Sequence, residues 1–201
     1  MLTAPSDWYY RTNLVTYSIN TEGYRTREFD EIAWQHSIVL FGDEMAFGQG
    51  LTDTDTIAHH LSTLTSQPVV NLAQPGSSAE WNLHTALDVL ETYGQPSAAV
   101  FIWPNAGRWI SYEHALPQHQ GPWTPQQWPL RDQIERSRRA AGLARSLFNR
   151  HRHFTLQTDH AELYNAQQLD AKLLQMQPSR CGTSPGRSVT IQIANEIRLS
   201  L

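Results

Sequence analysis

The sequence predicts a doubly wound α/β domain built on a parallel sheet, and three observations lead to this prediction. Three short segments, at about 36–41, 69–72 and 98–103, are rich in consecutive apolar residues. Segments with helical spacing of apolar residues lie between them, and each apolar segment ends in a polar or glycine-containing turn. Continuous apolar strands are typical of parallel sheets buried on both faces, and the alternation of strand and helix is typical of doubly wound folds.

The first half of the chain supplies three strands and two helices of this fold. Residues 1–34 are rich in aromatic side chains without regular periodicity, so we expect an extended leader that packs through its rings on a single domain, 35–201. A helix is expected at about 54–66, capped by Thr54 or Asp55. A second helix is expected at about 79–93, where apolar residues recur at helical spacing: Trp81, Leu83, Leu87 and Leu90.

The second half opens with a long segment, 109–129, that contains three tryptophans and four prolines. We expect a loop there, and loops of this length are usually lids, binding surfaces or partner contacts. The remaining elements are expected to be a helix at about 130–149, a strand at 154–156 and helices at about 160–175 and 187–199. The first of these helices carries Arg131, Arg136, Arg138, Arg139 and Arg145, which form either a solvated face or an arginine-lined anion or partner site.

Composition narrows the function classes. The chain has 201 residues, 40% of them hydrophobic, which suits one domain with a real core. Its net charge of −4 offers no general attraction to nucleic acid or to an anionic membrane, so neither is expected as a partner. One cysteine excludes an internal disulfide, and no signal peptide or membrane span is visible. We therefore expect a soluble protein located in the cytoplasm.

Four polar stretches are expected to meet at one edge of the sheet. Ligands of open α/β sheets bind where the carboxyl ends of strands meet helix N-termini. The turns after the three strands are 42–44, 75–77 and 104–106, and the stretch 180–186 precedes the last helix. Together they form the candidate site.

These stretches carry a resemblance to the SGNH (GDSL-like) hydrolases. They read FGDEMAFGQG at 41–50, NLAQPGSS at 71–78, WPNA at 103–106 and RCGTSPG at 180–186, in the order in which that family has its conserved blocks. The resemblance covers about residues 17–199 and implies a flavodoxin-like three-layer α/β/α sandwich that cleaves esters. The leader, YSINTEGYRTREF at 17–29, also resembles a subgroup found in marine bacteria and large tailed phages.

The resemblance also implies that the catalytic residues are missing. The family's nucleophilic serine falls on Glu44, its aspartate on Cys181 and its base histidine on Ser184. Acyl transfer needs an oxygen nucleophile, a base within hydrogen-bond reach and a carboxylate that orients the base, and these three residues do not supply them. Asp43, beside the nucleophile position, and the oxyanion-hole positions Gly76 and Asn105 are retained.

The retained donors suggest why a glutamate stands at 44. The backbone N–H groups of residue 44 and Gly76, with the side-chain amide of Asn105, would form a cluster suited to an oxyanion. We expect the Glu44 carboxylate to fold into this cluster and satisfy it permanently. Asn105 could instead be a plain turn residue rather than a donor to this cluster. Glu44 could instead be a catalytic residue, either a nucleophile or a general base, in an unconventional reaction.

Other residues offer weaker alternatives. Ser77 or Ser78 with His84 as base would be substitute catalysts, although a capping role at the next helix is the simpler interpretation. Cys181 is either a reactive thiol or a small buried residue. The adjacent His59 and His60 would point in different directions on a helix, and His151 and His153 on a strand would share one side but supply only two ligands. We therefore expect no metal site, and no other cofactor is expected either. Trp103, Trp109, Trp123 and Trp128 either pack internally or form a surface for a glycan or protein.

The sequence thus favours a catalytically inactive protein of the SGNH type that works by binding or assembly. The expected partner is a protein or further copies of the chain, with a glycan or small acyl compound as the alternative ligand. A virion component that reuses the fold is one version of this hypothesis. The alternative is an esterase or acetyl hydrolase of the same fold that uses unconventional residues.

Overall fold

The computed structural model describes residues 15–113, 116–120, 129–155, 158–169 and 186–201. Its centre is a five-stranded sheet in the order β2-β1-β3-β6-β7, in which every neighbouring pair of strands is parallel. The strands are β1 (Ile38–Gly42), β2 (Val69–Asn71), β3 (Ala98–Trp103), β6 (His151–Thr155) and β7 (Gln167–Gln168). The doubly wound parallel sheet predicted from the sequence is therefore confirmed.

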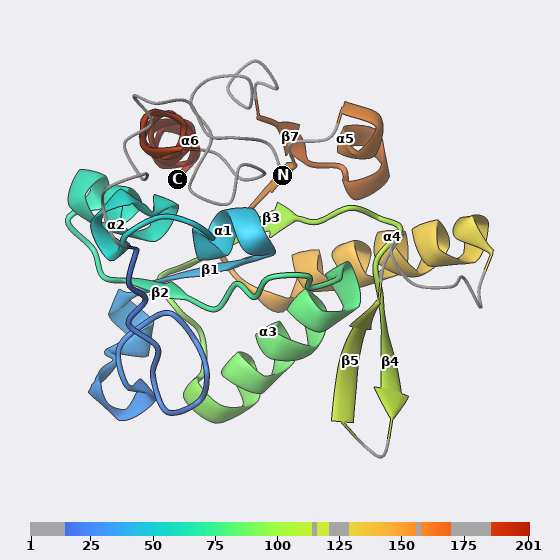
Figure 1. Cartoon of the computed structure of the whole chain (residues 1–201), viewed down its shortest axis with the longest axis horizontal. Helices are drawn as coiled ribbons and strands as arrows, with labels where there is room; N and C mark the ends of the chain where they lie inside the picture. Colours follow the sequence, from blue (N-terminus) through green and yellow to red (C-terminus); the bar gives the residue numbers. More distant parts are fainter. Residues whose placement is uncertain (1–14, 114–115, 121–128, 156–157, 170–185) are drawn as a thin grey trace.

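Helices cover both faces of the sheet and make a three-layer α/β/α sandwich (Figure 1). In that view α2 (Ile57–Thr65) and α6 (Arg187–Ser200) lie on the upper-left side of the sheet, and α3 (Ala79–Tyr93) and α4 (Leu130–Leu147) lie on its lower-right side. Side chains of β1 alternate between two cores, so that Leu40 packs with α2 and α6 whereas Phe41 packs with α3 and α4. Burial on both faces explains the unbroken apolar runs of β1 and β3.

Segment 109–120 is not the loop that the sequence predicts. It forms an antiparallel hairpin of β4 (Trp109–Glu113) and β5 (Leu116–Gln120), which projects from the body beside α3 (Figure 1). Pro117 disfavours a strand because proline cannot donate to a ladder. A two-stranded ribbon has free outer edges where proline is tolerated, which is why the strand forms despite it.

The segment after β6 also differs from the prediction. β6 begins at His151, three residues before the expected strand, and α5 (Thr158–Tyr164) ends well before 175. Asn165 has φ = 44°, the left-handed conformation common just after a helix. Beyond it, β7 adds a short strand to the sheet, and residues 170–185 lie outside the described part of the chain.

The described part of the leader, residues 15–34, packs on the domain through its rings. Trp34 stacks on Tyr93 of α3 with ring centroids 4.1 Å apart, and Phe29 meets Trp34 edge-on at 5.3 Å. Both residues lie in short 3₁₀ helices, η2 (Phe29–Glu31) and η3 (Trp34–His36), rather than in fully extended chain. These contacts fix the leader against the α3 side of the sandwich.

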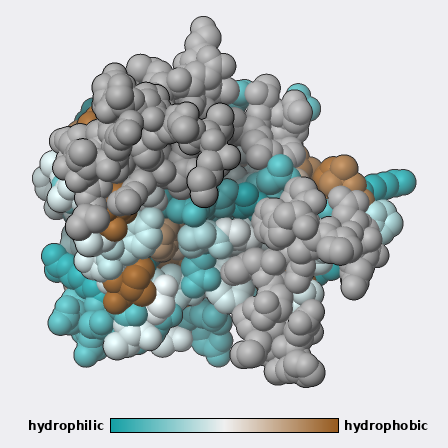
Figure 2. All heavy atoms as spheres, in the orientation of Figure 1, coloured by the Kyte–Doolittle hydropathy of each residue, from teal (hydrophilic) through white to brown (hydrophobic). Residues whose placement is uncertain are grey.

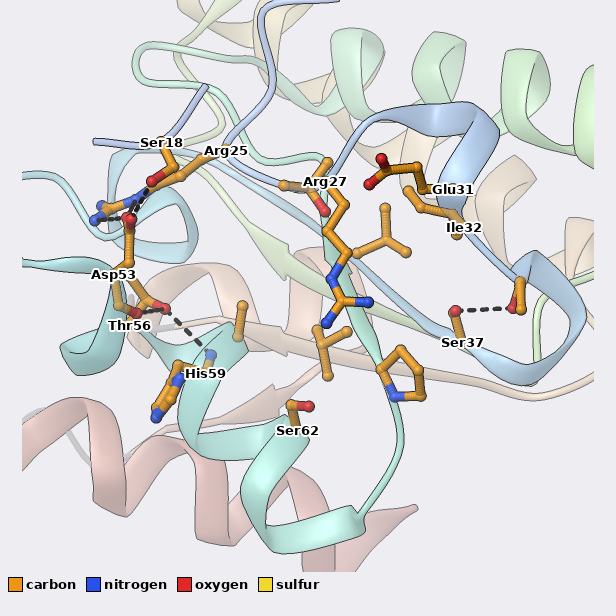
Figure 3. A pocket seen from close by; sticks show the side chains of 16 residues that line it. Ser18, Arg25, Arg27, Glu31, Ile32, Ser37, Asp53, Thr56, His59 and Ser62 are labelled. Atoms are coloured by element: carbon orange, nitrogen blue, oxygen red, sulfur yellow. Dashed lines mark hydrogen bonds and ion pairs between the residues drawn. The ribbon is translucent and has the colours of Figure 1, made fainter. Parts of the chain in front are cut away.

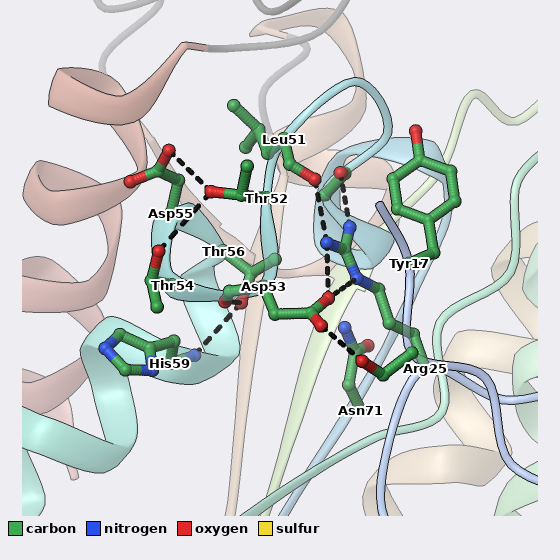
Figure 4. Close-up of polar contacts among 12 residues, drawn as sticks. Tyr17, Arg25, Leu51, Thr52, Asp53, Thr54, Asp55, Thr56, His59 and Asn71 are labelled. Carbon is green, nitrogen blue, oxygen red and sulfur yellow. Dashed lines mark hydrogen bonds and ion pairs between the residues drawn. The ribbon is translucent and has the colours of Figure 1, made fainter. Parts of the chain in front are cut away.

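A buried arginine holds the leader to the loop after the first strand (Figure 4). Arg25 donates to both Phe47 and Gly48 carbonyl oxygens at 3.2 and 2.7 Å, and to the Leu51 carbonyl at 2.7 Å. It also makes a two-point contact with Asp53, in η4 (Asp53–Asp55), at 2.8 and 2.7 Å. The guanidinium is thus fully occupied in joining two segments that are distant in sequence.

The coloured part of the face drawn in Figure 2 shows no single large apolar patch. Outside the grey residues, hydrophobic side chains appear there as small separate patches among polar ones (Figure 2). Within the described part of the chain, no helix is both long enough and apolar enough to span a bilayer.

Candidate functional site

The turn after β1 places two carboxylates at the carboxyl end of the sheet. Gly42 ends the strand in a position where a side chain does not fit, because an added Cβ would lie 2.5 Å from the Ala46 Cβ. Asp43 then caps the one-turn helix α1 (Glu44–Phe47) by accepting a hydrogen bond from the Met45 N–H at 3.1 Å. Glu44 is the first residue of that helix.

The turn after β2 brings a backbone donor to Glu44. Gly76 has φ = 78°, a conformation that favours glycine, and its N–H donates to Glu44 Oε2 at 3.2 Å. Ser77 fixes the two turns together, since its hydroxyl donates to the Gly42 carbonyl at 2.8 Å. The contact expected between Glu44 and Gly76 is present.

The main partner of Glu44 is an arginine that the sequence analysis did not single out. Arg108 follows the turn after β3, and its Nη1 and Nη2 donate to Glu44 Oε2 and Oε1 at 2.7 and 2.6 Å. Nη1 also donates to Asp43 Oδ2 at 3.1 Å. The side chains of Arg108 and Asp43 are each 12% exposed, and that of Glu44 is 27% exposed. This is a partly buried charge cluster of two carboxylates and one guanidinium.

Asn105 does not contact Glu44 by a hydrogen bond among the described residues. Its side-chain oxygen accepts instead from the Gly107 N–H at 2.8 Å, and its carbonyl accepts from the Arg108 N–H at 3.1 Å. These bonds shape the turn that presents Arg108. The expected third donor to Glu44 is therefore a guanidinium rather than the Asn105 amide, and Asn105 has the turn role that was the alternative.

The cluster shifts the pKa values of both carboxyl groups. Burial, and then the negative charge of Glu44, raises the pKa of Asp43 to about 7. Burial also acts to raise the pKa of Glu44, but hydrogen bonds and charge from Arg108 outweigh it and lower that pKa. Glu44 is thus held as a carboxylate, while Asp43 is the group that can exchange a proton near neutral pH.

The two serines beside Gly76 have structural partners. Ser77 and Ser78 are fully buried, and the Ser78 hydroxyl accepts from the Trp81 N–H at 3.2 Å as the N-cap of α3. The capping role predicted for Ser78 is confirmed. His84, considered as their base, is exposed on α3.

The histidine pairs behave as their backbone geometry predicts. His59 and His60 lie on α2 with ring planes 77° apart. His151 and His153 point to the same side of β6, where His153 Nε2 and His151 Nδ1 lie 3.1 Å apart. No cluster of three or more metal-ligating side chains occurs in the part of the chain that the structure describes.

The remaining candidates divide between buried and undescribed residues. Trp103 and Trp109 are 2% and 5% exposed, so they pack internally and do not form a binding surface. Trp123, Trp128, Cys181 and Ser184 lie outside the described residues. The sequence did contain a signal for Arg108. This residue comes just after the turn that ends the third strand, and Glu44 and Gly76 lie in the turns that end the first two strands.

Comparison with known proteins gives matches at the level of structure. No family model and no curated protein sequence matches the chain. The psychrotrophic esterase EstA from a Pseudoalteromonas species matches with a TM-score of 0.51 and 12% identity, over 82% of this chain and 96% of that one. A member of the lipolytic G-D-S-L family from Veillonella parvula matches with a TM-score of 0.55 and 12% identity, over 82% and 99%.

A third structure adds a further description. It is a carbohydrate esterase whose active site is described as displaying divergent catalytic and non-catalytic binding functions, with a TM-score of 0.50 and 13% identity over 85% of this chain and 69% of that one. At these identities the likeness shows the fold. The chain has the three-layer fold of the SGNH (G-D-S-L) hydrolases, as the sequence resemblance implied.

Proposed function

We propose that the chain is a non-catalytic protein of SGNH fold that acts through binding or assembly. The observation that carries the proposal is the closed contact of Glu44 with Arg108 and the Gly76 N–H. An oxyanion-binding pocket must be open to a substrate oxygen in order to stabilise a tetrahedral intermediate. Here a carboxylate of the chain itself takes up the Gly76 donor, and the guanidinium keeps that carboxylate ionised.

Among the residues described around this contact, none pairs a nucleophilic side chain with a base that could accept its proton. Glu44 has no proton to lose, and attack by its carboxylate would give an anhydride rather than an ester. The Ser77 hydroxyl donates to a backbone carbonyl, and Ser78 caps a helix. Cys181 and Ser184, at the positions of the orienting carboxylate and the base, are residue types unsuited to these roles near neutral pH.

A binding role has a precedent among proteins of this fold, since a carbohydrate esterase that matches the chain is described as having non-catalytic binding functions. An assembly role is favoured by the β4–β5 hairpin, which stands out from the body as an arm for contact with another protein (Figure 1). The proposed partner is accordingly a protein or further copies of the chain, as in a virion component, with a glycan as the alternative ligand.

A second candidate function is ester hydrolysis with unconventional residues. It is favoured by the pKa of Asp43, which burial and Glu44 raise to about 7, because a carboxyl group titrating near neutral pH is suited to proton transfer. Asp43 would then be the general base that activates a water molecule. The two candidates differ in whether Asp43 and Glu44 are needed for turnover.

Hydrolysis of a chromogenic acetyl ester by the purified chain separates the two candidates. We expect the unmodified chain, Glu44→Gln and Asp43→Asn to hydrolyse the ester at the same slow rate as the buffer. Turnover by the unmodified chain that is lost in either variant would overturn the non-catalytic proposal. The molar mass in solution, from light scattering after size exclusion, tests assembly against the 22.9 kDa of one chain.

Introducing the family's catalytic residues into the chain is a second test of the non-catalytic proposal. Glu44→Ser alone should remain inactive, because the base and orienting positions are still unfilled. Glu44→Ser combined with Cys181→Asp and Ser184→His supplies all three groups of the family's mechanism. Activity in Glu44→Ser alone would contradict the view that the whole proton-transfer machinery is absent.

A further inference from the structure

A cavity lies at the edge of the sheet, away from the charge cluster (Figure 3). Its volume is about 470 Å³, within the range of small-molecule sites. Its walls come from the leader, the edge strand β2 and the first two turns of α2. Asp43, Glu44, Gly76 and Arg108 do not line it, so this cavity is separate from the site described above.

Two arginines of the leader line the cavity, and they differ in what they bind. Arg25 is buried and its guanidinium is occupied by Asp53 and three backbone carbonyls. Arg27 is exposed, and its guanidinium makes no hydrogen bond or ion pair with any other residue that the structure describes. Figure 3 shows it turned away from Glu31, toward the side of the cavity where His59 and Ser62 lie. Arg27 is therefore available to an anion from outside.

Part of the cavity lining is apolar and includes an open sheet edge. Ile32, Ala33, Pro68, Val69 and Val70 line it. The Pro68 carbonyl accepts from the Ile38 N–H and the Leu72 N–H donates to the Leu40 carbonyl, so the N–H and C=O of Val69 face away from β1. This backbone offers one donor and one acceptor beside an apolar surface.

The charges around the cavity favour a ligand with a single negative charge. The acids in the lining are Glu31 and Asp53, and Asp53 is already bound by Arg25 and by the Ser18 hydroxyl at 2.6 Å. The second acidic side chain in the lining, Glu31, disfavours a dianion such as phosphate more than a monoanion. One guanidinium matches one carboxylate by two parallel hydrogen bonds.

We propose that this cavity is a binding site for a small amphipathic carboxylate. Its carboxylate pairs with Arg27, and the His59 ring on the same side offers a further polar contact. Its aliphatic or aromatic part packs on Ile32, Val69 and Val70. The site is independent of the function proposed for the Glu44 cluster, because no residue is shared between them.

Titration of the ¹⁵N-labelled protein with hexanoate, followed by amide chemical shifts, tests the proposal. Hexanamide has the same shape without the charge, and inorganic phosphate has the charge without the apolar part. We expect hexanoate to shift the amides of Val69, Val70 and His59 saturably, and hexanamide and phosphate to bind at least roughly tenfold more weakly. Arg27→Gln should weaken hexanoate binding by a similar factor, and Arg27→Lys should weaken it less.

Arg139→Gln is the matched control, because Arg139 is an exposed arginine on α4, far from the cavity in the fold. Binding of hexanoate should be unchanged in it. Three results would overturn the proposal: no saturable shift with hexanoate, undiminished binding in Arg27→Gln, or equal binding of phosphate. Arg27 makes no side-chain bond with the described residues, so loss of binding in its variants reports on the ligand contact rather than on folding.

Discussion

Arg108 holds Glu44 by a two-point ion pair, with its two terminal nitrogens 2.7 and 2.6 Å from the two carboxylate oxygens. This pair lies where the turns after β1, β2 and β3 converge, the position at which open α/β sheets bind their ligands. A guanidinium that faces a carboxylate in this geometry is among the stronger polar contacts in proteins. At this edge of the sheet, the chain itself supplies both the anion, the Glu44 carboxylate, and the guanidinium of Arg108 that binds it.

Removal of Arg108 should destabilise the fold through the charges it leaves behind. In Arg108→Met, Asp43 and Glu44 remain as neighbouring carboxyl groups in a partly buried site, and we expect a loss of about 3 kcal/mol in the free energy of unfolding. Adding Glu44→Gln should recover part of this loss. Urea unfolding of both single variants and the double variant measures the coupling, and additive effects would contradict the pairing.

The fold could be predicted from the sequence because its signals are local and repeated. Apolar runs marked β1, β2 and β3, and helix α3 occupies the predicted residues, 79–93. The hairpin was missed because Pro117 gives a local signal against a strand that tertiary context overrides. The end of α5 was not predicted because the sequence does not show whether a given asparagine, here Asn165, adopts the left-handed conformation that ends the helix.

The sequence predicted where the candidate site lies in the fold but not the ion pair between Glu44 and Arg108. Glu44 was expected beside Gly76 because the turns after parallel strands lie at the same edge of the sheet. Arg108 was not predicted, because its approach depends on the turn that Asn105 builds with Gly107. The resemblance directed attention to the Asn105 amide as a donor, whereas the structure uses that side chain to shape the backbone.

Asp43 should give the stability of the protein a distinctive pH dependence. Its folded-state pKa of about 7 lies above its ordinary value of 3.8. Between these values the folded state holds a proton that the unfolded state has lost, so this group's contribution to stability falls as pH rises, by about 1.4 kcal/mol per pH unit. The stability of the unmodified chain minus that of Asp43→Asn should therefore decrease from about pH 4 to 7. Parallel curves would refute the shifted pKa.

His153 should contribute with the opposite sign. Burial lowers its pKa from 6.5 to about 2, and its Nδ1 accepts from the Trp103 indole N–H at 3.0 Å. Below pH 6.5 the unfolded state takes up a proton that the folded state refuses, so this contribution to stability falls as pH falls. The stability of the unmodified chain minus that of His153→Phe should decrease from about pH 6.5 to 4. Urea midpoints across this range measure it, and a constant difference would be contrary evidence.

Gly42 should not tolerate a side chain. In Gly42→Ala the new Cβ would lie 2.5 Å from the Ala46 Cβ and 3.0 Å from the Ile102 carbonyl oxygen. We expect overpacking to reduce the free energy of unfolding by about 1–3 kcal/mol. Gly142→Ala is the matched control, because a Cβ added there, in the middle of α4, meets no atom within 4 Å apart from its chain neighbours and the backbone of its own helix. That variant should gain about 0.5–1 kcal/mol, and equal effects in both would contradict the steric argument.

Arg25 should decide whether the leader stays attached to the domain. Its guanidinium joins the leader to the loop that follows α1 and lies over the Tyr17 ring at 4.4 Å (Figure 4). Arg25→Met leaves three backbone carbonyls without their donor and Asp53 with the Ser18 hydroxyl alone, so we expect a loss of about 3 kcal/mol and faster chymotrypsin cleavage within the leader. Arg27→Met, two residues away and exposed, is the control and should be cleaved at the rate of the unmodified chain. Equal cleavage of the two variants would mean that the ring cluster around Trp34, rather than Arg25, holds the leader in place.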